Sequence, residues 1–230
     1  RRWQLVYGVR GSYGFNLTVY GPNRPLHSGH YGNWAPNPIM LLTELIGSMR
    51  DSSGNILVEG FGRQVRPLSS AERAAIAASP RMDEELTADL GIGKPETEER
   101  LELAITRPAL NIRGIRAGDV GERARNAIQP SASASIGLRL VPDQTPQYLR
   151  NVIEKHITAQ GYLIIRAEPT ADQRNEYQRL ARIDWASAGG YPAYRTVFDH
   201  ALAGEISESL SDLSDGTLSR TPTVGGSLRL

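Results

Sequence analysis

Residues 131–141 alternate strictly between apolar side chains and small or polar ones. The apolar members are Ala132, Ala134, Ile136, Leu138 and Leu140, and the members between them are Ser133, Ser135, Gly137 and Arg139. Because successive side chains of a strand point to opposite faces, this pattern predicts a strand with one buried and one open face. Such a strand needs partner strands and a second layer over its apolar face, so the chain is constrained to a layered fold.

Further elements follow from periodicity and capping. Strands are also expected over residues 12–20, 108–112 and 162–167. Two amphipathic helices are expected, one that begins at Pro38 behind an Asn37 cap and one that runs from Thr145 to a stop at Gly161. The order strand, helix, strand, strand, helix, strand predicts an α+β fold: a ferredoxin-like antiparallel sheet with two helices on one face.

Two regions lie outside this order. Residues 61–106 contain two expected helical segments, and we interpret them as a helical insertion into the simpler core. After residue 170 the chain becomes more polar and is expected to form a C-terminal helical extension. We therefore divide the chain into residues 1–170 and residues 171–230.

Composition excludes some classes of function. Of the 230 residues, 40% are hydrophobic, which is enough for a folded core. The 26 Lys and Arg nearly balance the 25 Asp and Glu, so we expect neither nucleic acid nor a membrane as a partner. There are no cysteines, which excludes disulfides and thiolate ligands but leaves the compartment open: cytoplasmic and exported locations are both compatible with a soluble chain.

Residues 21–38, GPNRPLHSGHYGNWAPNP, place His27 in a loop between a strand and a helix, where polar side chains can be both rigid and exposed. Spacing alone also fits a loop histidine without a special role. His30 follows three residues later, but His156 and His200 lie far along the chain, so we expect no metal site within this chain. His156 lies on an apolar helix face and is expected to be a partly buried core residue.

Two other features could bind an anion. Arg139 lies on the polar face of its strand, where a planar guanidinium could grip a carboxylate through two hydrogen bonds. An ordinary surface arginine is the common alternative. Residues 225–227, Gly-Gly-Ser, could offer backbone N–H groups and a hydroxyl to an anion, although such a triplet is more often a flexible turn.

An ordered set of blocks adds a resemblance. The blocks are GVRGSYGFNLTVYGP, LHSGHYG, NPIMLLTELIGSMRD, RPALNIRGIRAG, NAIQPSASASIGLRLVPDQTP, YLIIRAEP, PAYRTVFD and PTVGGSL. Together they resemble the lid, or dimerisation, domain of the zinc-dependent aminoacylase, carnosinase and carboxypeptidase family of metallopeptidases (peptidase clan MH). The resemblance covers most of the chain except residues 61–106. It makes residues 1–170 the lid and residues 171–230 the return toward a catalytic domain that this chain lacks.

The resemblance implies a mechanism and a role for each matching residue. In such enzymes two zinc ions in the separate catalytic domain activate a water that attacks an amide carbon. His27 matches the histidine that stabilises the oxyanion at the partner subunit's site. Arg139 matches the arginine that binds the substrate carboxylate, and Asn126 matches a substrate contact. Ser227 and Gly226 match the segment at the substrate end. The resemblance thus implies a homodimer that acts on small peptides or N-acyl amino acids.

Two departures from the family pattern limit what this chain can do. It has neither the HxD metal motif nor the paired-glutamate motif of the family's catalytic domain, and it ends in GGSLRL where relatives have GGSLP or GGSIP. We therefore expect either an excised portion of an enzyme or a degenerate relative, inactive alone and without its own zinc. The alternative is a non-catalytic ferredoxin-like module for protein interaction or small-ligand regulation.

Overall fold

The computed structural model describes residues 3–187, 190–214 and 218–226. Its strands are β1 (Gln4–Val6), β2 (Gly8–Val9), β3 (Gly11–Tyr20), β4 (Leu26–His27), β5 (Ala109–Arg116), β6 (Ala127–Ile128), β7 (Ser131–Leu140), β8 (Leu163–Ile165), β9 (Leu180–Trp185), β10 (Tyr194–Arg195) and β11 (Ser219–Thr221). Its helices are α1 (Ser28–Tyr31), α2 (Pro38–Met49), α3 (Ser70–Ala78), α4 (Asp83–Asp89), α5 (Leu101–Ala104), α6 (Pro146–Ala159), α7 (Ala171–Glu176) and α8 (Ala201–Leu213), with a short 3₁₀ turn, η1 (Gly121–Arg123).

The centre of the fold is a five-stranded sheet with the order β5-β7-β3-β9-β8. Strand β7 pairs antiparallel with both β3 and β5, and β3 pairs antiparallel with β9. The strand predicted from the alternation of residues 131–141 is therefore present, and the α+β class is confirmed. One pair differs from the prediction of a wholly antiparallel sheet, because β8 runs parallel to β9 and makes the sheet mixed.

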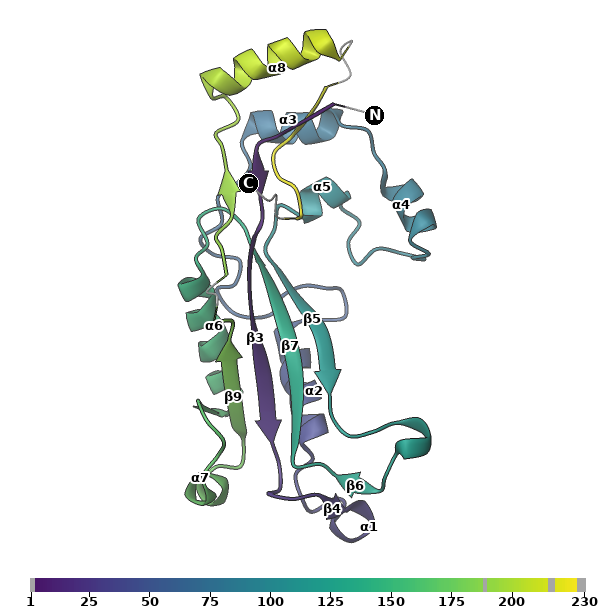
Figure 1. Cartoon of the computed structure of the whole chain (residues 1–230), viewed down its shortest axis with the longest axis vertical. Helices are drawn as coiled ribbons and strands as arrows, with labels where there is room; N and C mark the ends of the chain where they lie inside the picture. The colour runs from purple at the N-terminus through teal and green to yellow at the C-terminus, as the bar shows by residue number, and fades with distance from the viewer. Residues whose placement is uncertain (1–2, 188–189, 215–217, 227–230) are drawn as a thin grey trace.

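The apolar face of the sheet forms the main core with helices α2 and α6. Phe15 and Leu17 of β3 stand opposite Ile136 and Ala134 of β7, and all four are buried. Leu42, Leu45 and Met49 of α2 and Leu149, Ile153 and Ile157 of α6 pack in the same cluster. Both helices lie behind the sheet in Figure 1, which leaves the other face of β3 and β7 open. The predicted caps are also present: the Asn37 side chain caps α2 and the Thr145 side chain caps α6.

The last strand of the predicted order does not lie beside β3. Residues 162–167 were expected to be the last strand, but β8 is short and lies at the edge of the sheet. The position beside β3 belongs to β9, within a segment that was expected to be helical. Trp185 of β9 stacks on Tyr13 at 5.1 Å between ring centroids and donates from Nε1 to Glu154 at 2.8 Å. These contacts tie β9 to both β3 and α6.

The insertion is helical, as predicted, and packs beside the ends of the chain. Helix α3 begins with a capping box between Ser69 and Glu72. Glu72 also forms a buried ion pair with Arg195 of β10, 2.9 Å long, which ties the insertion to the returning chain. In that region β1 pairs with β11 and β2 with β10, so the first and last described segments lie side by side (Figure 1).

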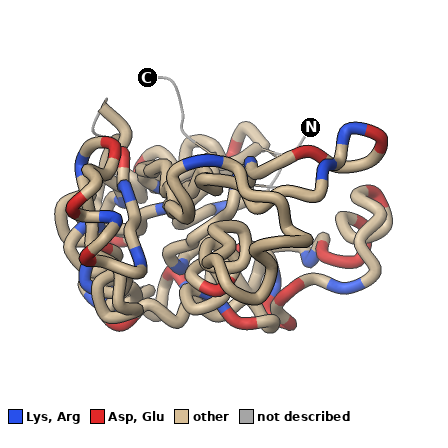
Figure 2. Tube along the Cα trace, turned by 90° about the horizontal axis from the view of Figure 1, so that it is seen from below, with Lys and Arg blue, Asp and Glu red and all other residues tan. Residues whose placement is uncertain are grey.

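Acidic and basic residues are mixed over most of the chain, although the charged residues of helix α4 are all acidic. Figure 2 shows acidic and basic residues interspersed along the trace rather than gathered by sign. None of the described helices combines the length and the hydropathy that a membrane span requires.

Candidate functional site

His27 lies in a short two-stranded ribbon beyond one end of the main sheet. In this ribbon β4 pairs antiparallel with β6, and His27 stands opposite Ala127. The Ser28 N–H donates to the carbonyl of Asn126 at 3.0 Å. His27 and Asn126 are both exposed. The ribbon therefore brings together two predicted site residues that are 99 positions apart in the sequence (126 minus 27).

The orientation of the His27 ring is fixed by its own helix. His27 is the N-cap of α1, and its Nδ1 accepts a hydrogen bond from the Gly29 N–H at 3.1 Å. Because Nδ1 accepts, the neutral imidazole carries its proton on Nε2, which is then a donor. Gly29 is required for this contact, since a Cβ at position 29 would lie 2.9 Å from Cε1 of the His27 ring. The exposed ring thus presents an N–H donor at the junction of β4 and α1.

Arg139 lies at the opposite end of β7. It stands between Ser12 of β3 and Ala109 of β5, and its side chain is exposed on the open face, away from buried Leu138 and Leu140. Within the described residues Arg139 forms no ion pair. Strand β7 has ten residues, so at about 3.3 Å per residue roughly 30 Å of strand separates Arg139 from the His27 ribbon. The predicted site residues of one protomer therefore form two separated groups, His27 with Asn126 at one end of β7 and Arg139 at the other, which we call the two half-sites.

Arg10, which was not among the residues predicted from the sequence, accompanies Arg139. Arg10 is buried and donates from Nη2 to the Arg107 carbonyl at 2.8 Å. Burial, and secondarily the nearby charge of Arg139, lower the pKa of Arg10 to about 10. It is still a cation at neutral pH. The only hint in the sequence is its position between glycines in YGVRG, which does not reveal a neighbour more than 120 residues away.

The Gly-Gly-Ser segment returns to this same end of the sheet. Val224 pairs with Val9, and its carbonyl accepts from the Arg10 N–H at 3.3 Å. Gly226 follows two residues later and is exposed. Ser227 lies outside the described residues. The segment that resembles the substrate-end contact therefore approaches the end of the sheet that carries Arg10 and Arg139.

His156 and His200 are not part of either half-site. The side chain of His156 is half-buried, as predicted, and its Nε2 lies 2.9 Å from the Ser48 hydroxyl. Burial lowers the pKa of His156. His200 is the N-cap of α8, but its side chain makes no capping hydrogen bond.

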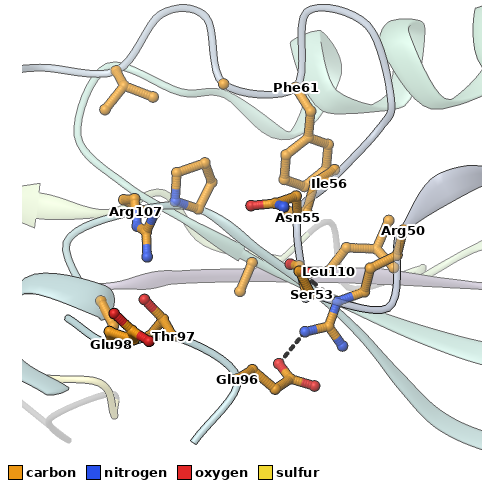
Figure 3. A pocket seen from close by; sticks show the side chains of 16 residues that line it. Arg50, Ser53, Asn55, Ile56, Phe61, Glu96, Thr97, Glu98, Arg107 and Leu110 are labelled. Carbon is orange, nitrogen blue, oxygen red and sulfur yellow. Dashed lines mark hydrogen bonds and ion pairs between the residues drawn. The ribbon is translucent and has the colours of Figure 1, made fainter. Parts of the chain in front are cut away.

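A separate cavity of about 620 Å³ lies between the α2–β5 side of the sheet and the insertion (Figure 3). Arg50 at the end of α2 forms an ion pair with Glu96 of the insertion at its rim. Phe61 and Leu110 line its apolar side. The residues that line it include none of the predicted site residues, so this cavity is not one of the half-sites.

The described residues do not provide a metal site. No group of three His, Asp or Glu side chains within them is placed to hold an ion, and the sequence has no cysteine. The zinc ions that the resemblance implies therefore do not fit the residues described here.

Comparison with known proteins gives a family match. The model of the family described as "Peptidase dimerisation domain" matches residues 7–164. The chain is 30% identical over 158 residues to the Cys-Gly metallodipeptidase DUG1 of Saccharomyces cerevisiae, which covers 67% of this chain and 33% of that protein. It is 29% identical over 187 residues to the Beta-Ala-His dipeptidase of Mus musculus, and the match covers 79% of this chain and 35% of that protein. The chain thus spans about a third of the length of these curated relatives.

Solved structures show the same architecture. A metallo-carboxypeptidase from Sulfolobus solfataricus matches with a TM-score of 0.79 and 26% identity, over 99% of this chain and 55% of that one. The dipeptidase Dug1p from Saccharomyces cerevisiae matches with a TM-score of 0.77 and 22% identity, over 99% and 45%. The second likeness shows the fold alone. In both cases the solved chain is much longer than the part that this fold covers.

Proposed function

Because the chain belongs to the peptidase dimerisation domain family, we propose that it is the lid and dimerisation portion of a zinc-dependent metallopeptidase or amidohydrolase. The reaction is hydrolysis of a peptide or N-acyl amino acid amide bond, and the zinc ions belong to a catalytic domain outside the described residues. The observation that carries this proposal, beside the family match, is the division of the predicted site residues between the two ends of β7.

We assign the half-sites to different subunits of a homodimer. The partner subunit's His27 donates its Nε2–H to the oxyanion that forms when the amide carbon is attacked. The partner subunit's Asn126 contacts the substrate beside it. Arg139 of the first subunit binds the substrate carboxylate, and Gly226 and Ser227 contact the same end. The hydrogen bond to Nδ1 supports this role, because it leaves the N–H donor on Nε2 of an exposed side chain.

The topology supports a specific dimer. Strand β5 is an edge of the sheet, and α2 packs behind the neighbouring β7. Edge strands leave backbone groups unpaired, and a two-fold axis pairs such strands antiparallel. Ala109 at the start of β5 stands beside Arg139, whereas Arg116 at its end lies toward the His27 ribbon. Antiparallel pairing of two β5 strands therefore brings the His27 end of one subunit level with the Arg139 end of the other.

Two finer assignments belong to the same proposal. The core unit is ferredoxin-like, with β9 rather than residues 162–167 as its fourth strand, an arrangement that the order β5-β7-β3-β9 supports. The division of the chain predicted after residue 170 is better placed after Trp185, because β9 pairs with β3.

The test uses the complete reading frame that contains this chain. Its purified product should hydrolyse Cys-Gly or β-Ala-His when supplied with zinc, and a chelator should abolish that activity. The 230-residue chain alone should not hydrolyse either dipeptide. A complete product that dimerises but hydrolyses no dipeptide or N-acyl amino acid would favour the non-catalytic interaction or regulatory module instead.

A further inference from the structure

Arg10 lies just before strand β3, at the end of the sheet that carries Arg139. Its guanidinium reaches the carbonyl of Arg107, which precedes β5. Because β7 lies between β3 and β5, this hydrogen bond carries the Arg10 side chain across the end of β7. That end of β7 holds Arg139, so the two guanidinium groups are neighbours.

The returning chain encloses Arg10. Gly8 stands so close to β10 that a Cβ would lie 2.4 Å from the Tyr194 carbonyl oxygen, and a side chain there would separate the two strands. The Val224 carbonyl accepts from the Arg10 N–H on the other side. As a result only 8% of Arg10 is exposed, although it carries a full charge at neutral pH.

This charge has no counter-ion among the described residues. The Arg10 Nε is buried and has no hydrogen-bond partner among the described residues. Neither Arg10 nor Arg139 forms an ion pair with any described residue. Arg107 is different, because its guanidinium pairs with Glu99 at 2.7 Å. A buried cation without a partner is costly, and a second cation beside it adds repulsion. A bound carboxylate would offset both the cost of burying the cation and the repulsion between the two cations, and it would be held by charge-assisted hydrogen bonds.

We propose that Arg10 and Arg139 form a paired guanidinium subsite in which Arg10 is the second cation that binds the C-terminal carboxylate of a peptide substrate. This inference rests on the proposed function and extends it to a residue that the resemblance does not assign. Arg139, which is exposed, meets the carboxylate first. Arg10, which is held by the Arg107 carbonyl, supplies a fixed charge behind it.

The test compares a dipeptide that has a free carboxylate with the same dipeptide as its C-terminal amide, using the complete enzyme. The readout is the ratio of the two kcat/KM values. Arg10→Met should lower the acid-to-amide ratio by about tenfold or more, the effect expected for a charge-assisted hydrogen bond, mainly through KM. Arg10→Lys, which keeps the charge, should retain part of the preference and serves if the Met variant does not fold. Arg107→Met keeps the carbonyl that anchors Arg10 and is the matched control, with an unchanged ratio.

Each outcome has a distinct meaning. A purely structural role for Arg10 would lower both kcat/KM values together and leave the ratio unchanged, which overturns the inference. The same holds if Arg139→Met loses the preference while both Arg10 variants keep it. An enzyme that cleaves acid and amide equally well overturns the carboxylate role of both arginines. A complete product without hydrolase activity overturns the proposed function and this inference with it.

Discussion

Asn126 and Arg139 lie at opposite ends of strand β7: Asn126 precedes β6 and β7, and Arg139 is the penultimate residue of β7. A ten-residue strand is about 30 Å long, too long for one small substrate to touch both residues. In the proposed two-fold dimer, the Asn126 end of one protomer lies next to the Arg139 end of its partner, so one substrate could contact both residues. The following predictions test that arrangement and the groups that it joins.

The first prediction concerns His27 in the complete enzyme. His27→Ala should lower kcat by about 10²–10³-fold with a smaller change in KM, because the donor acts on charge that develops only in the transition state. Zinc content and dimerisation should be unchanged, as measured by metal analysis and light scattering. His30→Ala, on the adjacent and equally exposed helix α1, is the matched control. Equal losses for both histidines would contradict a specific role for His27.

The second prediction concerns Gly29. Gly29→Ala should displace the His27 ring from its Nδ1 contact, because the added methyl would meet Cε1 at 2.9 Å. Nitrogen NMR on the chain alone should show the Nε2–H tautomer of His27 in the wild type and a mixture of tautomers in the variant. Gly47→Ala is the control, since nothing lies within 4 Å of a Cβ at that helical position. An unchanged His27 spectrum in Gly29→Ala would show that the cap does not set the tautomer.

The third prediction concerns the dimer axis. The sequence contains no cysteine, so a single introduced cysteine reports its own neighbours. In antiparallel pairing about a two-fold axis, a residue near the middle of β5 faces its own copy, so Arg113→Cys should form a disulfide-linked dimer under mild oxidation. Lys155→Cys, exposed on α6, should remain monomeric on a non-reducing gel. Cross-linking through Lys155→Cys but not Arg113→Cys would place the dimer contact on the other side of the sheet.

The fourth prediction concerns pH and His156. Burial lowers the pKa of His156 in the folded chain below its unfolded value of about 6.5. As the pH falls below about 6.5, the unfolded state binds a proton that the folded state does not yet bind. The free energy of unfolding should therefore decrease with falling pH until the pH reaches the lower pKa of the folded state. Urea titrations between pH 7.5 and pH 5 should therefore show a smaller decrease for His156→Gln than for the wild type. His200→Gln, at an exposed cap, should behave like the wild type, and equal effects of both substitutions would contradict this account.

The sequence predicted the parts of the fold that rest on local pattern. The alternation of residues 131–141 and the Asn37 cap each determine an element without help from distant residues, and both are present. Strand β9 was missed although Ala181, Ile183 and Trp185 alternate with Arg182 and Asp184. That alternation is short and follows a polar capping box at Thr170, which correctly predicts a helix but says nothing about its length.

The residues of the half-sites could be predicted only in part from the sequence. His27 and Arg139 could be selected by residue type, local pattern and resemblance, but no local rule joins His27 to the Asn126 loop. Arg10 could not be found at all, because its significance comes from burial by the returning chain and from a neighbour on another strand. Only the three-dimensional arrangement reveals a buried cation that has no counter-ion among the described residues.

The proposed division of one active site between two subunits is tested most directly by mixing two impaired variants of the complete enzyme. One subunit carries His27→Ala and the other carries Arg139→Met. If the partner subunit's His27 completes the site that contains Arg139, each mixed dimer has one site with both residues intact, and activity should return on mixing. If both residues serve the same subunit, neither site in a mixed dimer is complete. Stable mixed dimers, verified by mass spectrometry, that are no more active than the parent variants would contradict the account.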